Sequence, residues 1–256
     1  MIKLVDLLLE NDQKPKAIFL AGPAGSGKST FVRNFLQNKG LKSINVDDSY
    51  EELLRQAGLD KPQSGFTADE LSQAAKMMGR AQKATREKFA KAMEDAESVI
   101  IDGTGAAFNP VKKKKEALED LGYDTMMVML YVSPITSLMR NKERGDAGGR
   151  SLRPSIVMRT WDDVNKNIPA YQQMFGNDFI IKNNDPEDAN KQYDQEEINK
   201  YFDVVSYSPT VDDPKKAEKK AKEAEDREKR IKTALNNLPN FDSDSSITSK
   251  INSFLS

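Results

Sequence analysis

Residues 17–30, AIFLAGPAGSGKST, decide the fold of this chain. An apolar run passes directly into a glycine-rich loop of the form G-x-x-x-x-G-K-[ST], and Phe31, Phe35 and Leu36 then continue at helical spacing. Strand, phosphate loop and helix therefore follow one another in the order that a nucleoside triphosphate site requires. We expect the triphosphate to be bound by the loop residues Gly22, Pro23, Ala24, Gly25, Ser26, Gly27, Lys28, Ser29 and Thr30.

Two residues at the end of this loop have separate roles in the motif. The ammonium of Lys28 reaches the β- and γ-phosphates, and the hydroxyl of Ser29 completes the oxygen shell of a Mg²⁺ ion. The loop thus predicts ATP and Mg²⁺ as cofactors. The alternative interpretation is a flexible Gly/Ser turn between a strand and a helix.

The composition excludes several kinds of chemistry. The 256 residues include 39 Lys and Arg against 40 Asp and Glu, so the formal net charge is −1. A chain so close to neutral has no global field for nucleic acid, and a polyanion would need a local basic patch. Cys and His are both absent, which excludes disulfides, thiol catalysis, zinc sites with nitrogen or sulfur ligands, and His-based triads. A general base must therefore be a carboxylate, a Lys or a Tyr.

Strand and helix patterns alternate along the chain after the loop. Further strands are expected at 42–46, 98–102, 126–132 and 178–184. Helices are expected at 67–97, from Pro110, at 135–144 and through Trp161. This alternation predicts an α/β fold of the P-loop NTPase type, with a five-stranded parallel sheet covered by helices on both faces.

The first residues show an amphipathic pattern at 2–10 that carries acids and lacks a signal-peptide cleavage site. No apolar run approaches membrane-spanning length. We therefore expect a cytoplasmic protein with no membrane partner, in which residues 1–207 form the P-loop domain.

Residues 208–256 differ from the rest and are expected to be a charged extension. Opposite charges four apart predict a long exposed helix at 212–238. A weak coiled coil or a docking helix for a protein partner is the alternative. Residues 239–256 are rich in Ser, Asp and Asn, and we expect disorder there apart from a short apolar end at Ile251, Phe254 and Leu255.

Carboxylates follow two of the predicted strands, at the edge where open α/β sheets bind ligands. Asp47 can accept the proton of an acceptor hydroxyl, and Asp48 can hold a metal-bound water. Asp102 ends its strand as a metal-binding carboxylate would, but Gly103 follows where motor ATPases usually place a catalytic Glu. This pattern favours phosphoryl transfer over hydrolysis. The alternatives are structural: the Asp pair caps a helix beginning near Ser49, and Asp102 caps its loop.

Arginines mark a candidate lid over residues 140–159. Arg140 and Arg144 lie four apart on one helical face, so both guanidinium groups can point at a single anion. Glycines follow as a hinge, and Arg150 and Arg153 lie in the loop beyond them. The alternative is a solvated basic helix end favoured by the helix dipole.

Four stretches together resemble the kinase domain of phage-type 5′-polynucleotide kinases and the related zeta-toxin kinases: residues 22–30, 44–48, 102–104 and 140–145. The resemblance extends over residues 16–185. It implies an ATP-dependent phosphotransferase in which Asp47 is the general base. It further implies that Lys28 and Ser29 bind phosphate and Mg²⁺, and that Arg140 and Arg144 contact the transferring phosphoryl group.

The acceptor is the least determined part of this prediction. The lid hexapeptide is closer to the polynucleotide kinases, so the 5′-hydroxyl of an oligonucleotide is favoured. Those enzymes have an Arg three residues after the base, however, where this chain has Tyr50. A zeta-toxin-like sugar-nucleotide or other small-metabolite kinase is therefore an alternative, as is a nucleotide-gated binding module without transferase activity.

We expect acceptor contacts from Asp48, Tyr50, Thr104 and Arg150. For an oligonucleotide, Arg150, Arg153 and Arg159 offer cations for a flanking phosphate. Tyr50, Trp161 or Tyr171 could stack a base, as the aromatic residues of single-strand binders do.

Overall fold

Strand β1 (Lys16–Ala21), which leads into the phosphate loop, lies in the middle of a parallel sheet. The structure, a computed structural model, describes residues 14–59, 65–186 and 236–256, with single positions between 222 and 234. Within these residues the sheet has five strands in the order β2-β3-β1-β4-β5, all parallel. The other strands are β2 (Lys42–Ile44), β3 (Val99–Asp102), β4 (Asp124–Tyr131) and β5 (Phe179–Asn183). The predicted five-stranded parallel sheet is confirmed.

The register of the strands determines which residues meet at the carboxyl edge of the sheet. Leu20 of β1 pairs with Asp102 of β3 and with Val128 of β4. Because β1 and β3 end together, the carboxylate of Asp102 lies beside the start of the phosphate loop. A ligand held by the loop is therefore within reach of this carboxylate.

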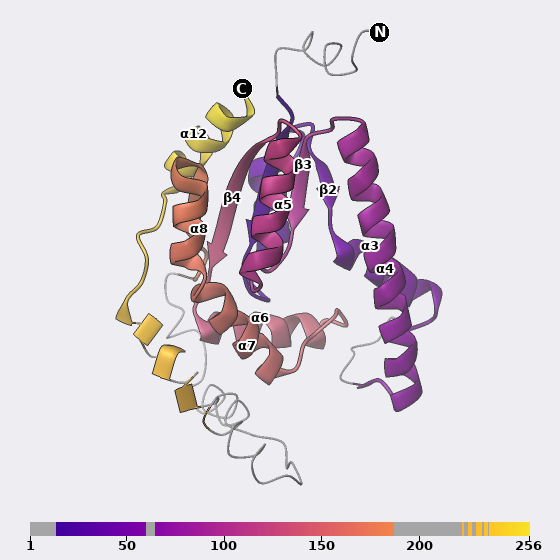
Figure 1. Ribbon diagram of the computed structural model, residues 1–256. Coiled ribbons are helices and arrows are strands. Elements are labelled where there is room, and N and C mark those ends of the chain that lie inside the picture. Colours follow the sequence, from indigo (N-terminus) through magenta and orange to yellow (C-terminus); the bar gives the residue numbers. More distant parts are fainter. Residues whose placement is uncertain are drawn as a thin grey trace.

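Helices pack on one face of the sheet, and Figure 1 shows α5 lying along the front of the strands. These helices are α4 (Ala68–Glu94), α5 (Phe108–Asp120), α7 (Pro154–Asn165) and α8 (Ile168–Phe175), which a short 3₁₀ turn (Gly176–Asp178) joins to β5. Trp161 and Tyr171 are completely buried in this layer. The strand residues here alternate with those that face the other layer, as β geometry requires.

The opposite face is covered by α2 (Lys28–Phe31), the π-helical turn η1 (Val32–Leu36) and α12 (Asp244–Leu255). Ile247, Ile251 and Phe254 of α12 are buried against the strands. The prediction of disorder for residues 239–256 is therefore wrong. The polar residues that suggested disorder form the solvent face of an amphipathic helix, whose apolar residues repeat at helical spacing.

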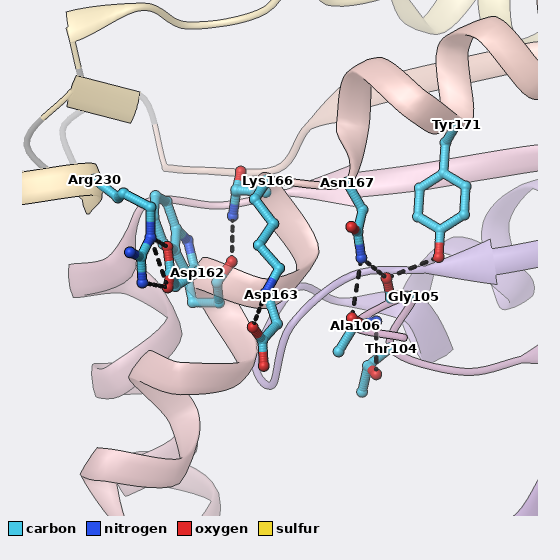
Figure 2. Close-up of polar contacts among 11 residues, drawn as sticks. Thr104, Gly105, Ala106, Asp162, Asp163, Lys166, Asn167, Tyr171 and Arg230 are labelled. Carbon is cyan, nitrogen blue, oxygen red and sulfur yellow. Dashed lines mark hydrogen bonds and ion pairs between the residues drawn. The ribbon is translucent and has the colours of Figure 1, made fainter. Parts of the chain in front are cut away.

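The described part of the extension belongs to the same core as the strands. Ile231 is buried on the α7 side, and Arg230 binds the buried Asp162 of α7 through Nη2–Oδ2 at 2.7 Å (Figure 2). Further along, the N–H of Asp242 donates to Ile181 O of β5 at 2.8 Å, and Asp242 Oδ2 accepts from Ile181 N at 3.0 Å. The chain thus passes along the free edge of β5 between the two faces.

Helix α3 (Val46–Gln56) and the first half of α4 pack together beside β2, and Figure 1 shows α4 extending past the sheet on that side. Between them they bury Tyr50, Leu54, Leu59, Ala74 and Ala81. Helix α4 begins with a capping box, in which Thr67 and Glu70 satisfy each other's backbone N–H groups. This agrees with the predicted helix over 67–97.

Two predictions lie largely outside the described residues. The amphipathic helix at 2–10 is one, and most of the charged helix at 212–238 is the other. Within the described part of the chain, no helix is both long enough and apolar enough to cross a membrane.

Candidate active site

A cavity of about 760 Å³ lies at the carboxyl edge of the sheet, between the phosphate loop, α3 and the lid helix α6 (Pro134–Asp146). Charged side chains of both signs line it. The cations are Lys28, Arg140, Arg144 and Arg150, and the carboxylates are Asp47, Asp48, Glu51 and Asp102. The structure therefore brings the predicted catalytic residues to one place. A hollow of the same volume at the other end of the strands contains none of them.

The phosphate loop is shaped by glycines with positive φ. Gly25 has φ +71° and Gly27 has φ +85°, conformations that L side chains rarely adopt. A Cβ on Gly27 would lie 2.3 Å from Nδ2 of Asn184, and one on Gly25 would lie 2.9 Å from Cβ of Arg140. Neighbouring side chains therefore occupy the space that these glycines leave. Residues 24–30 line the cavity, whereas Gly22 and Pro23 do not.

Lys28 points back along its own loop. Its Nζ donates to Gly22 O at 2.9 Å and to Pro23 O at 3.4 Å. Burial lowers the pKa of this ammonium, while the negative charges of Asp102 and Asp47 act in the opposite direction. Asp47 is thus close enough to Lys28 to influence its charge state.

Asp102 and Ser29 are the residues that could hold Mg²⁺. Asp102 Oδ2 accepts from Asn45 Nδ2 at 3.0 Å, while Oδ1 is buried and has no hydrogen-bond partner among the described residues. Burial raises the pKa of Asp102, and the charge of Lys28 opposes the shift. Ser29 and Asp102 line the same cavity, and an unsatisfied carboxylate oxygen with a hydroxyl is a donor set that fits Mg²⁺. This ion takes one or two protein ligands and completes its shell with phosphates and water. The described residues contain no larger metal-binding cluster of acids.

Asp47 and Asp48 lie in the first turn of α3 rather than before it. The N-cap is Asn45, whose Oδ1 accepts from Asp47 N at 2.8 Å and whose Nδ2 donates to Asp48 Oδ1 at 3.3 Å. The Asp pair is therefore not the cap that we considered as the alternative. Sequence reasoning missed Asn45, although an Asn between a strand and an acidic first turn is a usual N-cap signal.

The lid arginines reach the cavity, and each has a protein partner there. Arg140 Nη1 donates to Gly25 O at 3.1 Å, and Arg144 Nη2 pairs with Glu51 at 2.5 Å. Arg150 forms an ion pair with Asp47. The structure thus places Arg140 and Arg144 on different partners, whereas the sequence suggested that both point at one anion. Glu51, which sequence reasoning did not identify, lies one turn after Asp47 on the same face of α3.

The lid loop is folded back onto α6 by one buried side chain. Asn141 donates from Nδ2 to Leu152 O and accepts from Leu152 N at its Oδ1, both at 2.8 Å. The side chain amide therefore closes the loop that carries Arg150. The N–H of Gly149 also donates to Arg144 O at 2.8 Å.

The aromatic side chains that the sequence offered as base platforms are buried. Tyr50 is 3% exposed, and Trp161 and Tyr171 are 0% exposed. Tyr50 instead supports the lid, because the guanidinium of Arg150 lies 5.3 Å from the centre of its ring. Neither Trp161 nor Tyr171 lines the cavity. This arrangement offers no stacking surface from these three residues.

Thr104 lines the cavity and also fixes the start of the phosphate loop, since its carbonyl accepts from Gly22 N at 2.9 Å. The next residues are held from the other side, as Figure 2 shows. Tyr171 Oη donates to Gly105 O at 2.9 Å, and Asn167 Nδ2 donates to Ala106 O at 3.0 Å. The fold thus connects α8 through this loop to the phosphate loop.

Comparison with known proteins identifies one family. The zeta toxin family model matches residues 5–198 of this chain. No curated protein matches it.

Several solved structures are similar at low sequence identity. The AvrRxo1-ORF1:-ORF2 complex with ATP has a TM-score of 0.51 at 13% identity, over 96% of this chain and 82% of that chain. The PezAT toxin-antitoxin system of Streptococcus pneumoniae has a TM-score of 0.47 at 17% identity, over 86% and 87%. The Pnkp1/Rnl/Hen1 RNA repair complex has a TM-score of 0.47 at 20% identity, over 63% of this chain and 48% of that chain. At 13% identity, the similarity to the AvrRxo1-ORF1:-ORF2 complex is a similarity of fold alone.

Proposed function

Because the chain belongs to the zeta toxin family and is a P-loop kinase, we propose that it transfers the γ-phosphate of ATP to a hydroxyl group of a small polar acceptor. The observation that carries this proposal is the position of Asp47. It lies on the wall of the phosphate-loop cavity, within electrostatic reach of both Lys28 and Asp102. A carboxylate in this place can accept a proton in a chain that has no His.

Each residue of the site has a separate role in the proposed reaction. Lys28 exchanges the carbonyls of Gly22 and Pro23 for phosphate oxygens when ATP enters the loop. Asp47 takes the proton of the acceptor hydroxyl while the oxygen of that hydroxyl bonds to the γ-phosphorus. The bond from this phosphorus to the β–γ bridging oxygen breaks, and ADP leaves. Asp102 and Ser29 would hold Mg²⁺, which when bound neutralises charge on the phosphate oxygens.

The arginines of the lid must change partners for this chemistry to proceed. Arg150 is paired with Asp47, and Arg144 is paired with Glu51. The phosphoryl group offers both guanidinium groups a competing anion, and charge-assisted hydrogen bonds to it would free the carboxylates. Substrate binding and release of Asp47 from its ion pair are then one event, which keeps Asp47 bound to Arg150 until the phosphates arrive.

Two observations support a small acceptor over a polynucleotide. The aromatic residues that could stack a base are buried, and α3 presents Asp47, Asp48 and Glu51 to the cavity, where carboxylates can accept hydrogen bonds from several hydroxyl groups. A sugar nucleotide is the first candidate, because its hydroxyl groups can bond to these carboxylates. The 5′-hydroxyl of an oligonucleotide is the second, supported by the exposed residues Arg153 and Arg159 on the lid side.

The test is transfer of labelled γ-phosphate at two salt concentrations. The acceptors are UDP-N-acetylglucosamine, a set of nucleosides and a 5′-hydroxyl oligonucleotide, with Lys28→Ala as the inactive control. Labelling of a small acceptor supports the proposal. Labelling of the oligonucleotide alone, weakening as salt rises, would replace it with the second candidate.

A protein that binds ATP and a protein partner but labels no hydroxyl acceptor would be a nucleotide-gated binding module. A protein partner for residues 212–238 stays a prediction, because most of these residues lie outside those described.

A further inference from the structure

Consecutive carbonyl groups of the phosphate loop are held by side chains from outside the loop. Ser137 Oγ of α6 donates to Ala24 O at 2.6 Å, and Arg140 Nη1 of α6 donates to Gly25 O at 3.1 Å. Asn184, the residue after β5, donates from Nδ2 to Ser26 O at 2.8 Å. The loop is therefore anchored on its carbonyl side by two elements that are distant in sequence.

Holding a carbonyl also orients the next N–H group. The peptide unit is planar and trans, so the C=O of one residue and the N–H of the following residue point in opposite directions. The bond from Ser137 to Ala24 O thus turns the N–H of Gly25 away from α6. In the same way, the bond from Asn184 to Ser26 O turns the N–H of Gly27 away from β5.

The peptide between these two is used differently. The N–H of Ser26 donates to Pro23 O at 3.2 Å, which closes the turn of the loop. Fixing Gly25 O through Arg140 supports this turn. The other two N–H groups, those of Gly25 and Gly27, point away from the side chains that hold the loop. Both glycines line the cavity.

We propose that Ser137 and Asn184 are positioning residues that hold the N–H groups of Gly25 and Gly27 in place for the phosphates of ATP. The proposal rests on ATP binding in the proposed function. Neither residue is in the phosphate-loop motif. Ser137 is completely buried and Asn184 lines the cavity wall, and in this proposal each holds the loop backbone through its bond to a loop carbonyl. A loop whose donors are already aimed at the anion does not have to be ordered when the anion binds.

The two side chains are themselves fixed by the fold. Ser137 is 0% exposed, and its backbone N–H donates to Ser133 O at 3.0 Å within the start of α6. The backbone N–H of Asn184 donates to Tyr131 O of β4 at 2.8 Å. The side chain amide fills the space where a Cβ on Gly27 would stand. Supports built on a helix and a strand end are suited to hold a loop in one conformation.

The test compares Ser137→Ala and Asn184→Ala with two matched controls. Thr85→Val removes a buried hydroxyl that donates to Ala81 O at 2.8 Å in α4. Asn165→Ala removes an amide that donates to Trp161 O at 2.8 Å in α7. Each control therefore loses a hydrogen bond from a side chain to a backbone carbonyl, but at a place distant from the phosphate loop.

Three measurements are made on each full-length protein. Titration calorimetry gives the dissociation constant of ATP with Mg²⁺, and thermal unfolding without nucleotide gives Tm. Amide hydrogen exchange of the ATP-bound protein reports on the peptide containing residues 22–30. None of them requires the acceptor to be known.

Ser137→Ala and Asn184→Ala are expected to weaken ATP binding about five- to tenfold each, as the loss of one oriented donor does, and to reduce the ATP-induced protection of the loop. The controls should lower Tm to a similar extent and leave ATP affinity within about twofold. Loop variants that lower Tm while ATP affinity and loop protection match wild type would overturn the proposal, and the two bonds would then serve stability alone. If wild-type protein binds no ATP, the proposed function fails and takes this inference with it.

Discussion

Arg150 in the candidate lid and Asp47 at the start of α3 form an ion pair in the wall of the cavity. The lid and the helix that carries the candidate base are therefore connected before any substrate binds. While this pair lasts, the guanidinium of Arg150 occupies Oδ1 of Asp47, an oxygen that could otherwise bind the hydroxyl of an acceptor. The position of Arg150 thus sets when Asp47 can act as a base.

Replacement of Asp47 by Asn is expected to lower turnover by about 10² or more, because general-base catalysis supplies that order of rate. The affinity for ATP should stay within about threefold, since the loop is unchanged. Turnover with a labelled small acceptor and ATP calorimetry measure the two effects. Asp48→Asn is the control and should cost less, and equal small losses for both variants would exclude Asp47 as the base.

Replacement of Arg144 by Ala is expected to reduce turnover more than tenfold, because a cation that stabilises charge in the transition state is lost. Glu51→Gln removes the other half of the same ion pair and should leave turnover within about threefold. Steady-state kinetics on both variants make the comparison. If Arg144→Ala changes only the KM for ATP, the lid assignment is incorrect.

Helix α12 is expected to stabilise the whole domain. Ile251 is 1% exposed against the strands, so Ile251→Ala should lower the free energy of unfolding by about 2–4 kcal/mol, the usual cost of removing a buried aliphatic side chain. Urea unfolding measures the change. Ser249→Ala, on the exposed side of the same helix, should stay within about 0.5 kcal/mol. Similar small values for both variants would show that the helix does not contribute to the core.

Alkaline stability should depend on Tyr171. Burial raises the pKa of its hydroxyl to about 12, above the value of about 10 for an unfolded chain. Its contribution to stability is therefore complete below pH 10 and is lost as the pH rises through 12. Tyr171→Phe should be about 1 kcal/mol less stable than wild type at pH 8, because Gly105 O loses a donor.

The two proteins should become equally stable at about pH 11, since the native state must by then keep a proton that the unfolded chain has released. Urea unfolding at pH 8, 10 and 11 gives the comparison, in which the other tyrosines titrate equally. A difference that stays constant over this range would contradict the shift of the Tyr171 pKa.

The sheet could be predicted from the sequence because each buried strand is a continuous apolar run between turn signals, and the phosphate loop places β1 unambiguously. The residues of the cavity followed from the rule that ligands bind at the carboxyl edge of a parallel sheet. The partners of those residues could not be predicted in the same way. Nothing in the local pattern shows that Arg150 meets Asp47 or that Asn184 meets Ser26, because these contacts depend on how distant elements pack.

The C-terminal residues show the limit of reasoning from composition. Ser, Asp and Asn suggested disorder after 238, yet they supply the N-cap Ser243 and the solvent face of α12. A related limit is shown by Tyr50, Trp161 and Tyr171. The sequence alone does not distinguish an aromatic residue that stacks on a ligand from one that packs in the core. All three side chains are buried in the structure and therefore belong to the core.

The backbone of Asp242 beside Ile181 has a consequence for contact between molecules. A parallel sheet leaves unpaired N–H and C=O groups on its outer strands, and such an edge can pair with a strand of another molecule and begin aggregation. In this protein the Asp242 backbone N–H and side chain carboxylate occupy both backbone groups of Ile181, at the middle of β5. At the other end of the sheet, β2 extends only over Lys42–Ile44. One edge is blocked and the other is too short to be a good template, so the molecule is protected against growing its sheet by addition of another copy.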